Sequence, residues 1–439
     1  MNNELVHKNI YSVMERILFY GWLLFLFVFP WQSIWLLREV YSDGVKSQYA
    51  TLGIYATEGV IVLLFILGLC LFFSKANIIR SKRLGYARVT IVMLFFLYAA
   101  IQLTRASDLW LSVQTLRYML EAAAVIWIGL HMQHEKQQSL WALFFGILFC
   151  AIIGMVQFFT QERFSSVLLG MHAAPVFEAG TSVVVDATGR WLRAYGLFAH
   201  PNIFGGSMVL GLFVCTQLLL SYTKKTTQGF LLFAGGICSV GLYLSYSRSA
   251  WLAAMVLGIA LLLHIQVREK IKTLFLIYCV VWGILTALLP SLMLTRMFPV
   301  RMHETASLHE RIAGGEEALH LIAQAPVLGV GIGHYTQALQ QYMPDMPIWY
   351  YQPVHMVPLL FLAEWGIVGL LLVAALLIYF CVSQKITQKV AWSMLLVPVV
   401  PIMLFDHYLY SSFAGLLLLS LWILLVHSYV HSLSPSNAE

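Results

Sequence analysis

The stretch YYQPVHMVPLLFLAEWGIVG, residues Tyr350–Gly369, decides the fold of this 439-residue chain. After an aromatic start and a proline, it enters an apolar run that is long enough to cross a lipid bilayer. Two titratable residues, His355 and Glu364, interrupt that run near its beginning and near its middle. Polar groups in hydrocarbon are costly, so each of these two side chains is expected to have a specific task.

The composition indicates that the rest of the chain is of the same kind. Hydrophobic residues make up 60% of it and charged residues only 10%, whereas a soluble domain usually carries about 25% charged residues. Aromatic residues, at 14%, suit side chains that lie at membrane interfaces. The net charge of +6 does not predict nucleic-acid binding, because the basic residues line short loops between apolar runs. We therefore expect an integral membrane protein.

Apolar runs of spanning length recur along the chain, and we count twelve of them. The predicted fold class is all-α, a polytopic membrane protein of about twelve transmembrane helices that forms a single membrane domain over residues 1–439. No cleavage site follows the first run, so it is expected to be a retained helix. The predicted spans are residues 17–37, 51–73, 89–105, 109–130, 139–160, 201–222, 229–246, 250–267, 273–295, 354–382, 390–406 and 409–430.

The distribution of lysine predicts the orientation of these spans. With the N-terminus in the cytoplasm, ten of the eleven lysines face the cytoplasm and only Lys46 faces outward. Cytoplasmic loops of membrane proteins carry an excess of basic residues, so both termini are predicted to be cytoplasmic. Two long loops then lie on the outer face, residues 161–200 and 296–352, and any chemistry is expected there.

Arginine is the dominant cation on the predicted outer face. Its planar guanidinium group pairs bidentately with phosphate or carboxylate, whereas lysine is a hydrated point charge. An anionic ligand is one interpretation; the other is that arginine only occupies surface from which topology excludes lysine. The outer arginines are Arg38, Arg105, Arg163, Arg190, Arg193, Arg248, Arg296, Arg301 and Arg311.

The first motif on this face is RWLRAYGLFAHPNIFGG, residues Arg190–Gly206. Pro201 is suited to the first turn of the sixth span, because its missing N–H needs no partner there. The N-terminus of that helix offers free N–H groups and a partial positive charge to the outer solution. Arg193 beside it predicts an anion site, although a simple interfacial cap is the alternative.

The second motif is LSYSRSAW, residues Leu244–Trp251. Arg248 lies among serines at the predicted outer boundary of the membrane. A charged side chain in that position requires a partner or an aqueous cavity. A structural ion pair with Glu364 or Glu58 is the alternative to a ligand-binding role.

The third motif, residues Leu308–Tyr335, precedes the opening stretch. Residues 316–325 predict a short amphipathic helix. Gly329, Gly331 and Gly333 follow no strand and open no crossover helix, so they do not indicate a dinucleotide site. We expect them to form a tight turn close to the membrane surface.

The two titratable residues of the opening stretch are predicted to have separate tasks. His355 is placed in the first turn of the tenth span, where an imidazole titrates near neutral pH and reaches the outer aqueous layer. Glu364 lies nine residues further on, about 900° around a straight helix and about 13 Å deeper, unless Pro358 kinks the helix. His355 is therefore the candidate for chemistry, and Glu364 is expected to bind another helix. Arg117 and Glu121, at positions i and i+4, predict a structural pair.

These motifs resemble the O-antigen ligase and polymerase superfamily in their order along the chain and in their common predicted side of the membrane. The resemblance covers residues 190–370. It is carried by Arg193-x-x-Gly196, Pro201-Asn202, Ser247-Arg248 with Trp251, Arg311, Pro326, the turn Gly329–Gly333, and His355 followed by Glu364-x-Gly366-x-x-Gly369.

The resemblance implies a GT-C-like helical fold in the bacterial inner membrane and a metal-independent glycosyltransferase without cofactors. Its donor would be a glycan on undecaprenyl diphosphate at the periplasmic face. Arg193 and Arg248 would hold the diphosphate leaving group, and His355 would act as general base on the acceptor hydroxyl. Whether Arg190 or Arg193 is the functional arginine stays open. The expected substrate-binding residues are Arg190, His200, Asn202, Arg311, Tyr335 and Gln352.

Several functions remain compatible with these residues. A lipid A–core sugar is the favoured acceptor because the second outer loop is the longer one, but a polymerase acting on a second lipid-linked repeat and a transferase to protein hydroxyls are alternatives. A lipid or polysaccharide transporter is an alternative of another class, although no internal repeat typical of transporters is evident. An assembly partner without chemistry is the third. The expected partners are the lipid-linked donor, the glycan acceptor and membrane lipids, and no nucleic acid.

Overall fold

Helices that are long enough to cross a membrane dominate the structure. It is a computed structural model that describes residues 2–42, 44–76, 86–178, 180–263, 268–298, 302–383, 391–393 and 395–432. Arg301, the end of the predicted span 250–267 and the start of the predicted span 390–406 lie outside these residues. Within them, eight helices are both long and apolar enough to cross a membrane, and three shorter apolar helices accompany them. The all-α polytopic fold class is thereby confirmed.

The long helices follow the predicted spans closely. Helix α4, which carries Arg117 and Glu121, also follows a predicted span, although it is not one of the eight or of the three shorter apolar helices. The helices that correspond to predicted spans are α1 (Asn2–Val28), α2 (Ala56–Ala76), α3 (Tyr86–Arg105), α4 (Leu109–His131), α5 (Lys136–Thr160), α6 (Pro201–Ser221), α7 (Lys225–Leu244), α8 (Arg248–Leu263), α9 (Arg268–Leu288), α13 (Val357–Ser383), the segment Ala391–Phe405 with η3 (Val397–Val399) and α15 (Val400–Phe405), and α17 (Phe413–Ser432).

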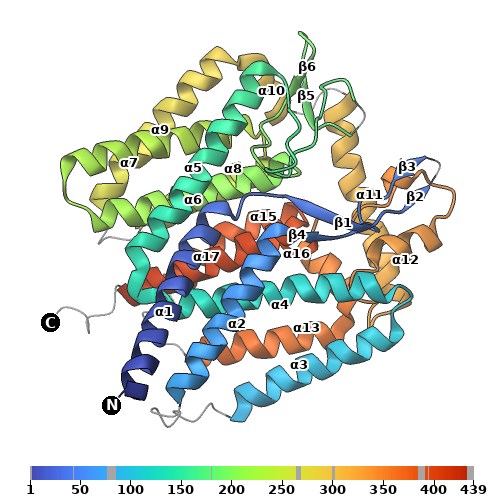
Figure 1. Ribbon diagram of the computed structural model, residues 1–439. Coiled ribbons are helices and arrows are strands. Elements are labelled where there is room, and N and C mark those ends of the chain that lie inside the picture. Colours follow the sequence, from blue (N-terminus) through green and yellow to red (C-terminus); the bar gives the residue numbers. More distant parts are fainter. Residues whose placement is uncertain are drawn as a thin grey trace.

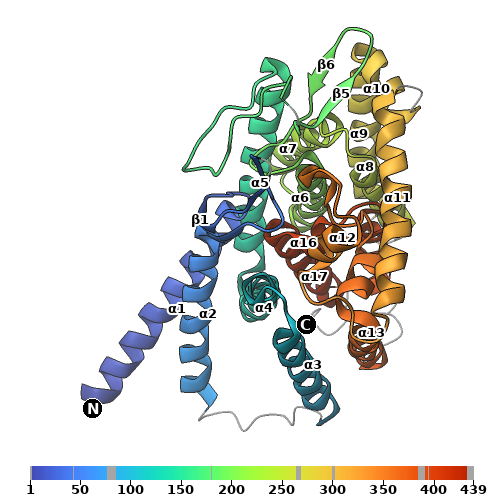
Figure 2. The same ribbon diagram turned by 90° about the vertical axis from the view of Figure 1, so that its right-hand side faces the viewer.

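Short elements gather at one end of the bundle, whereas the beginning of α1 and the end of α17 lie towards the other end (Figures 1 and 2). Helix α11 is the longest of these elements and runs beside α13. The short elements are β1 (Ile34–Arg38), β2 (Tyr41–Ser42), β3 (Val45–Lys46), β4 (Leu52–Tyr55), β5 (Val183–Val185), β6 (Arg190–Leu192), α10 (Pro290–Met297), α11 (Met302–Gln324), α12 (Tyr335–Tyr342), η2 (Ile348–Tyr350) and α16 (Tyr408–Ser411); η1 (Gln133–Glu135) precedes α5.

Helix α6 is the central element, and it is almost entirely buried because it is apolar on all sides. Its glycines allow other segments to approach closely. A Cβ atom at Gly205 would lie 2.9 Å from Ser245 Oγ, and one at Gly206 would lie 2.2 Å from Tyr408 Oη. These contacts bring the α7–α8 turn and the segment before α16 against the beginning of α6, which is where the site forms.

The first two predicted spans need a correction. Helix α1 ends at Val28, and Pro30, which lacks a backbone N–H, follows it. The apolar residues after Pro30 form β1, which pairs with β4 in an antiparallel hairpin with β2 and β3 at its tip. Residues 34–37 and 51–55 were therefore wrongly predicted as helix, because short apolar strands continue the hydropathy of a span.

Helix α13 is interrupted at Gly366, where φ is 62° and ψ is −172°. The alternative of a kink at Pro358 does not apply, because that proline is the second residue of the helix and is tolerated there. The predicted helix 316–325 is the last part of the longer α11, and the predicted span 273–295 divides at Pro290 into α9 and α10.

The turn Pro326–Gly333 packs directly on this interruption. Val330 N donates to Ala363 O at 2.8 Å, and Ile367 N donates to Pro326 O at 2.9 Å. A Cβ atom at Gly366 would lie 2.4 Å from Val327 O, and one at Gly329 would lie 2.3 Å from Glu364 O. Gly329 and Gly366 are therefore required for the close backbone approach between this turn and α13.

Glu364 fastens the same region. It is buried and accepts hydrogen bonds from Gly333 N at 3.0 Å, Tyr335 N at 3.3 Å and the Tyr410 hydroxyl of α16 at 2.5 Å. The expectation that Glu364 binds another helix is confirmed, and the turn after Gly329 is its second partner.

A second group of buried charges stabilises the neighbouring helices. Arg117 Nε lies 2.8 Å from Glu58 Oε2 and 4.0 Å from Glu121 Oε1. The predicted Arg117–Glu121 pair is therefore part of a cluster in which Glu58 is the closer partner.

Candidate functional site

Arg193 is the buried cation from which the site is built. Its Nε donates to Ser245 O at 2.7 Å, and its Nη2 donates to Asn202 Oδ1 at 2.6 Å. The loop that carries it folds tightly onto α6, because Gly196 has a φ of 57° and leaves no room for a Cβ atom beside Phe204. Arg193 therefore links the end of α7 to the beginning of α6.

Asn202 connects Arg193 to the carboxylate of Asp406. Its Nδ2 donates to Asp406 Oδ2 at 2.5 Å. His200 caps α6 by accepting from Asn202 N at 3.1 Å through Nδ1, while its Nε2 lies 3.0 Å from Ser182 Oγ. As predicted, Pro201 occupies the first turn of the helix.

Asp406 lies between α15 and α16 and is the centre of the site. It accepts from His407 N at 2.8 Å, and its Oδ1 lies 3.9 Å from His355 Nδ1. Burial opposes ionisation of this carboxyl group. The facing imidazole of His355 outweighs that effect and holds the pKa of Asp406 well below its usual range. The site therefore contains a buried carboxylate.

His355 is the accessible imidazole of the site. It lies in a bend before α13, and not within the first turn as expected. Its side chain is 29% exposed, whereas its Nδ1 is buried and has no hydrogen-bond partner. At 3.9 Å, Asp406 is too far for a hydrogen bond but is the nearest acidic partner. The exposure of the ring must come from its other atoms, which include Nε2.

Two further imidazoles flank this pair. The ring of His407 lies 5.0 Å from that of His355, and its Nδ1 is 2.6 Å from Ser411 Oγ. Burial, followed by the charge of His355, lowers the pKa of His407 to about 3. Burial and the charge of Arg193 lower the pKa of His200 to about 3. Both rings are therefore neutral at neutral pH.

Arg248 begins α8 at a turn that is strained and firmly held. Tyr246 has a φ of 47°, which is unusual for a bulky residue. Arg193 binds the carbonyl of Ser245, and Arg296 Nε binds the carbonyl of Tyr246 at 2.7 Å. Arg248 is half-buried and follows this turn directly. The carboxylates of the alternative interpretation have other partners, since Glu58 pairs with Arg117 and Glu364 binds backbone and Tyr410.

The remaining predicted residues divide into two groups. Arg311 on α11 is half-buried and close enough to His407 to contribute to the lowering of its pKa. Arg190 donates to Val176 O within the first outer loop, and Gln352 is exposed and donates to Trp349 O. Tyr335 is buried, and its hydroxyl donates to Gly314 O of α11. Its side chain therefore packs inside the protein and is not presented to a ligand.

Sequence reasoning missed Asp406 and His407. Asp406 is the last residue of the predicted span 390–406, and His407 begins the two-residue connection to the predicted span 409–430. A carboxylate and an imidazole next to each other at the end of an apolar run are the signal that could have identified them. Tyr49, whose ring lies 6.0 Å from that of His407, was missed as well.

The chemistry of this site combines fixed positive charge with a proton acceptor. Ligand atoms of His355, Asp406 and His407 lie within 4.8 Å of one another, a donor set that transition metals accept. Arg193 and Arg311 lie close to this group, and their positive charges disfavour the binding of a metal cation. Phosphate or carboxylate oxygens suit these arginines better.

Comparison with known protein families gives one result. The family described as O-antigen ligase matches residues 233–374, which include Arg248, Arg311 and His355. This match confirms the resemblance to the O-antigen ligase and polymerase superfamily and supports a glycosyltransferase-type activity on glycan or lipid-linked substrates. The family match and the apolar helices indicate a multi-pass protein of the inner membrane. No curated protein matches the chain.

Proposed function

We propose that this protein of the O-antigen ligase and polymerase superfamily transfers a glycan from undecaprenyl diphosphate to an acceptor hydroxyl, with a lipid A–core sugar as the favoured acceptor. The reaction takes place on the periplasmic side and needs neither metal nor cofactor. The observation that carries this proposal is the connected series Arg193–Asn202–Asp406, with His355 facing the same carboxylate.

The leaving group of this reaction is a diphosphate, and the arginines suit it. Negative charge grows on the bridging oxygen as the anomeric C–O bond breaks, and guanidinium groups held in place beforehand stabilise it without reorganisation. Arg193 is fixed by Ser245 and Asn202, and Arg248 follows a turn whose carbonyl groups are bound by Arg193 and Arg296. Arg193 contacts the first turn of α6, and Arg248 is the first residue of α8.

The acceptor hydroxyl must lose its proton, and His355 is the group that takes it. Its Nδ1 faces Asp406, so Nε2 is the nitrogen that receives the proton. The imidazolium that forms lies beside a carboxylate that is already ionised, which stabilises the charge. The 3.9 Å separation is typical of a catalytic contact that tightens when substrate binds.

Metal independence rests on the charges of the site. His355, Asp406 and His407 supply a single negative charge, and two arginines lie on the same side. These arginines provide the electrostatic stabilisation of a diphosphate that Mg²⁺ provides in many phosphoryl-transfer sites. We therefore expect transfer to continue in the presence of EDTA.

The proposed orientation places both termini in the cytoplasm. It is supported by the lysine distribution and by the position of the site elements at the end away from the termini (Figure 1). Cysteine labelling from outside tests it. A cysteine introduced at Lys46, in the β2–β3 hairpin, is expected to react with an impermeant reagent, and one introduced at Lys224 is not.

Mass analysis of lipid-linked glycans in a deletion strain tests the function and its acceptor. Unligated long chains indicate a ligase, and single repeats indicate a polymerase. Complementation with Arg248→Ala or His355→Ala is expected to leave the defect in place, while Lys46→Ala, an exposed outer cation, restores the wild-type pattern. Restoration by both site variants, at wild-type protein levels, contradicts the proposed roles.

A further inference from the structure

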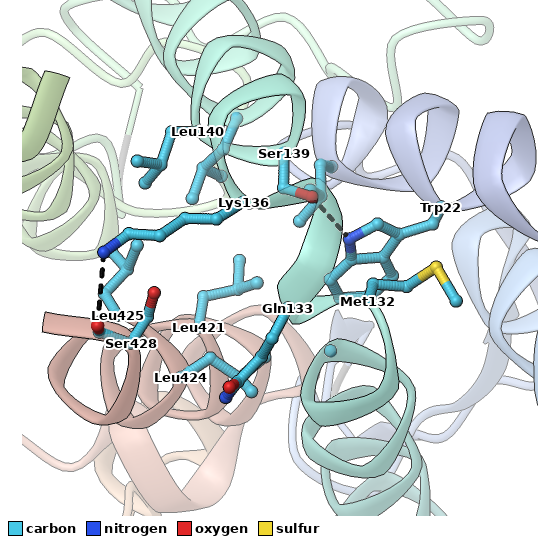
Figure 3. A pocket seen from close by; sticks show the side chains of 13 residues that line it. Trp22, Met132, Gln133, Lys136, Ser139, Leu140, Leu421, Leu424, Leu425 and Ser428 are labelled. Atoms are coloured by element: carbon cyan, nitrogen blue, oxygen red, sulfur yellow. Dashed lines mark hydrogen bonds between the residues drawn. The ribbon is translucent and has the colours of Figure 1, made fainter. Parts of the chain in front are cut away.

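A cavity of about 60 Å³ lies far from the candidate active site, between α1, the α4–α5 turn and the last turns of α17. Leucines of α5 and α17 line part of its wall, as Figure 3 shows. Five polar residues lie among these leucines, namely Trp22, Gln133, Lys136, Ser139 and Ser428.

Two side chains of the cavity, Lys136 and Gln133, have N–H donors to spare, whereas Trp22 Nε1 donates to Ser139 Oγ at 3.1 Å. An ammonium group has three N–H donors, and Lys136 Nζ uses one of them on Ser428 O at 3.1 Å. Gln133 Nε2 is buried and has no partner, and Figure 3 shows both side chains reaching towards α17. No carboxylate of the described residues forms an ion pair with Lys136. The cavity thus requires an anion or another acceptor.

Lysine side chains near the end of a membrane helix usually extend to the aqueous interface. Lys136 instead crosses the gap between two helices (Figure 3). Basic cavities between helices on the cytoplasmic side of a membrane are binding sites for anionic lipid head groups. In the proposed orientation this cavity lies on that side.

The size of the cavity and its surroundings fit a phospholipid. A volume of 60 Å³ holds about four water-sized groups, which is sufficient for a phosphate group and not for an acyl chain. The leucines and Met132 among the lining residues suit the apolar part of a lipid.

We propose that this cavity binds the phosphate group of an anionic phospholipid, with Lys136 as the cation and Gln133 as a second donor. The lipid holds α1, α5 and α17 together at the end opposite the candidate active site. The competing explanation is that Lys136 only neutralises the carbonyl end of α17.

Thermal unfolding of the full-length protein in nanodiscs separates these explanations. Wild type and Lys224→Met, which removes an exposed lysine of the same side, are expected to unfold at a higher temperature in phosphatidylglycerol than in phosphatidylcholine. Lys136→Met loses this difference, and Lys136→Arg keeps it. A lysine that only neutralises α17 lowers the unfolding temperature equally in both lipids, and that result overturns the proposal.

Native mass spectrometry provides the second measurement. Retention of phosphatidylglycerol is expected to weaken about fivefold in Lys136→Met, and to weaken also in Gln133→Leu, which removes a donor without changing the charge. Equal retention by Gln133→Leu, Lys136→Met and wild type means that the cavity holds water only, and overturns the proposal. Neither measurement uses glycan transfer, so the outcome is independent of the proposed enzymatic function.

Discussion

Replacing Asp406 by Asn tests the catalytic arrangement most sharply, because it removes a charge and almost no volume. Asp406 Oδ1 lies 3.9 Å from His355 Nδ1, and the carboxylate is buried. At an effective dielectric constant of about 20, two unit charges at this distance attract each other by about 4 kcal/mol. In the proposed mechanism that attraction is present only when His355 has taken the proton of the acceptor hydroxyl. It therefore stabilises the transition state of transfer and not the complex with bound substrate.

A loss of about 4 kcal/mol corresponds to about three orders of magnitude in rate. Because proton transfer is incomplete in the transition state, we expect kcat of Asp406→Asn to fall by about 10²–10³-fold, with KM nearly unchanged. The assay is transfer by purified protein in proteoliposomes with a synthetic lipid-diphosphate glycan. The two carboxylate oxygens accept from Asn202 and His407, and the amide of Asn can accept through only one oxygen. The unfolding temperature must therefore be measured in parallel.

Asp186→Asn is the matched control. Asp186 is also buried, but it accepts hydrogen bonds from Thr188 and Gly189 within the first outer loop, away from His355. We expect this variant to lose stability and to keep kcat within a few-fold of wild type. A folded Asp406→Asn protein that loses less than tenfold in kcat refutes the assigned role of the carboxylate.

Four further predictions concern stability and the leaving group. Glu364→Ala leaves three donors without their acceptor at a cost of about 1–3 kcal/mol each, so its unfolding temperature in detergent should fall clearly below that of Glu364→Gln. Gly366→Ala should be destabilised in the same assay, because its Cβ atom meets Val327 O at a positive φ, whereas Gly314→Ala on α11, where space is open, should not be. The pKa of His407 is about 3 in the folded protein and near 6.5 when unfolded, so the unfolded state binds more protons between these values and stability falls as the pH drops below 6.5. By pH 5 this group alone removes on the order of 2 kcal/mol, so unfolding curves of His407→Asn should depend less on pH than those of wild type. Arg193→Lys retains the charge but not the two directed hydrogen bonds to Ser245 and Asn202, and should lower kcat/KM for the diphosphate donor by at least tenfold; unchanged kinetics would show that only the charge matters.

Much of this architecture could be predicted from hydropathy, because a membrane requires about twenty apolar residues per helix. The same rule failed at residues 34–37, since four apolar residues of a strand look like the end of a span. It also could not locate the break at Gly366. A glycine is unremarkable in an apolar helix, and its purpose becomes visible only when the turn Pro326–Gly333 is seen against it.

The site was predictable in part for a related reason. Arg193, Arg248 and His355 are polar residues next to apolar runs, and topology places them on one side. Asp406 was hidden because it ends a short apolar run and precedes a two-residue turn. The bridge through Asn202 depends on contact between segments 204 residues apart, which no local pattern contains.

In the proposed mechanism, His355 receives the acceptor proton while arginines hold the donor diphosphate. Single-turnover transfer with purified protein, a synthetic undecaprenyl-diphosphate glycan, an acceptor and EDTA tests both roles at once. We expect wild type to release undecaprenyl diphosphate in equal amount to the glycan transferred. His355→Asn should bind the donor with unchanged affinity and transfer nothing. Transfer by His355→Asn at a rate near that of wild type, or loss of wild-type transfer on addition of EDTA, would contradict the account.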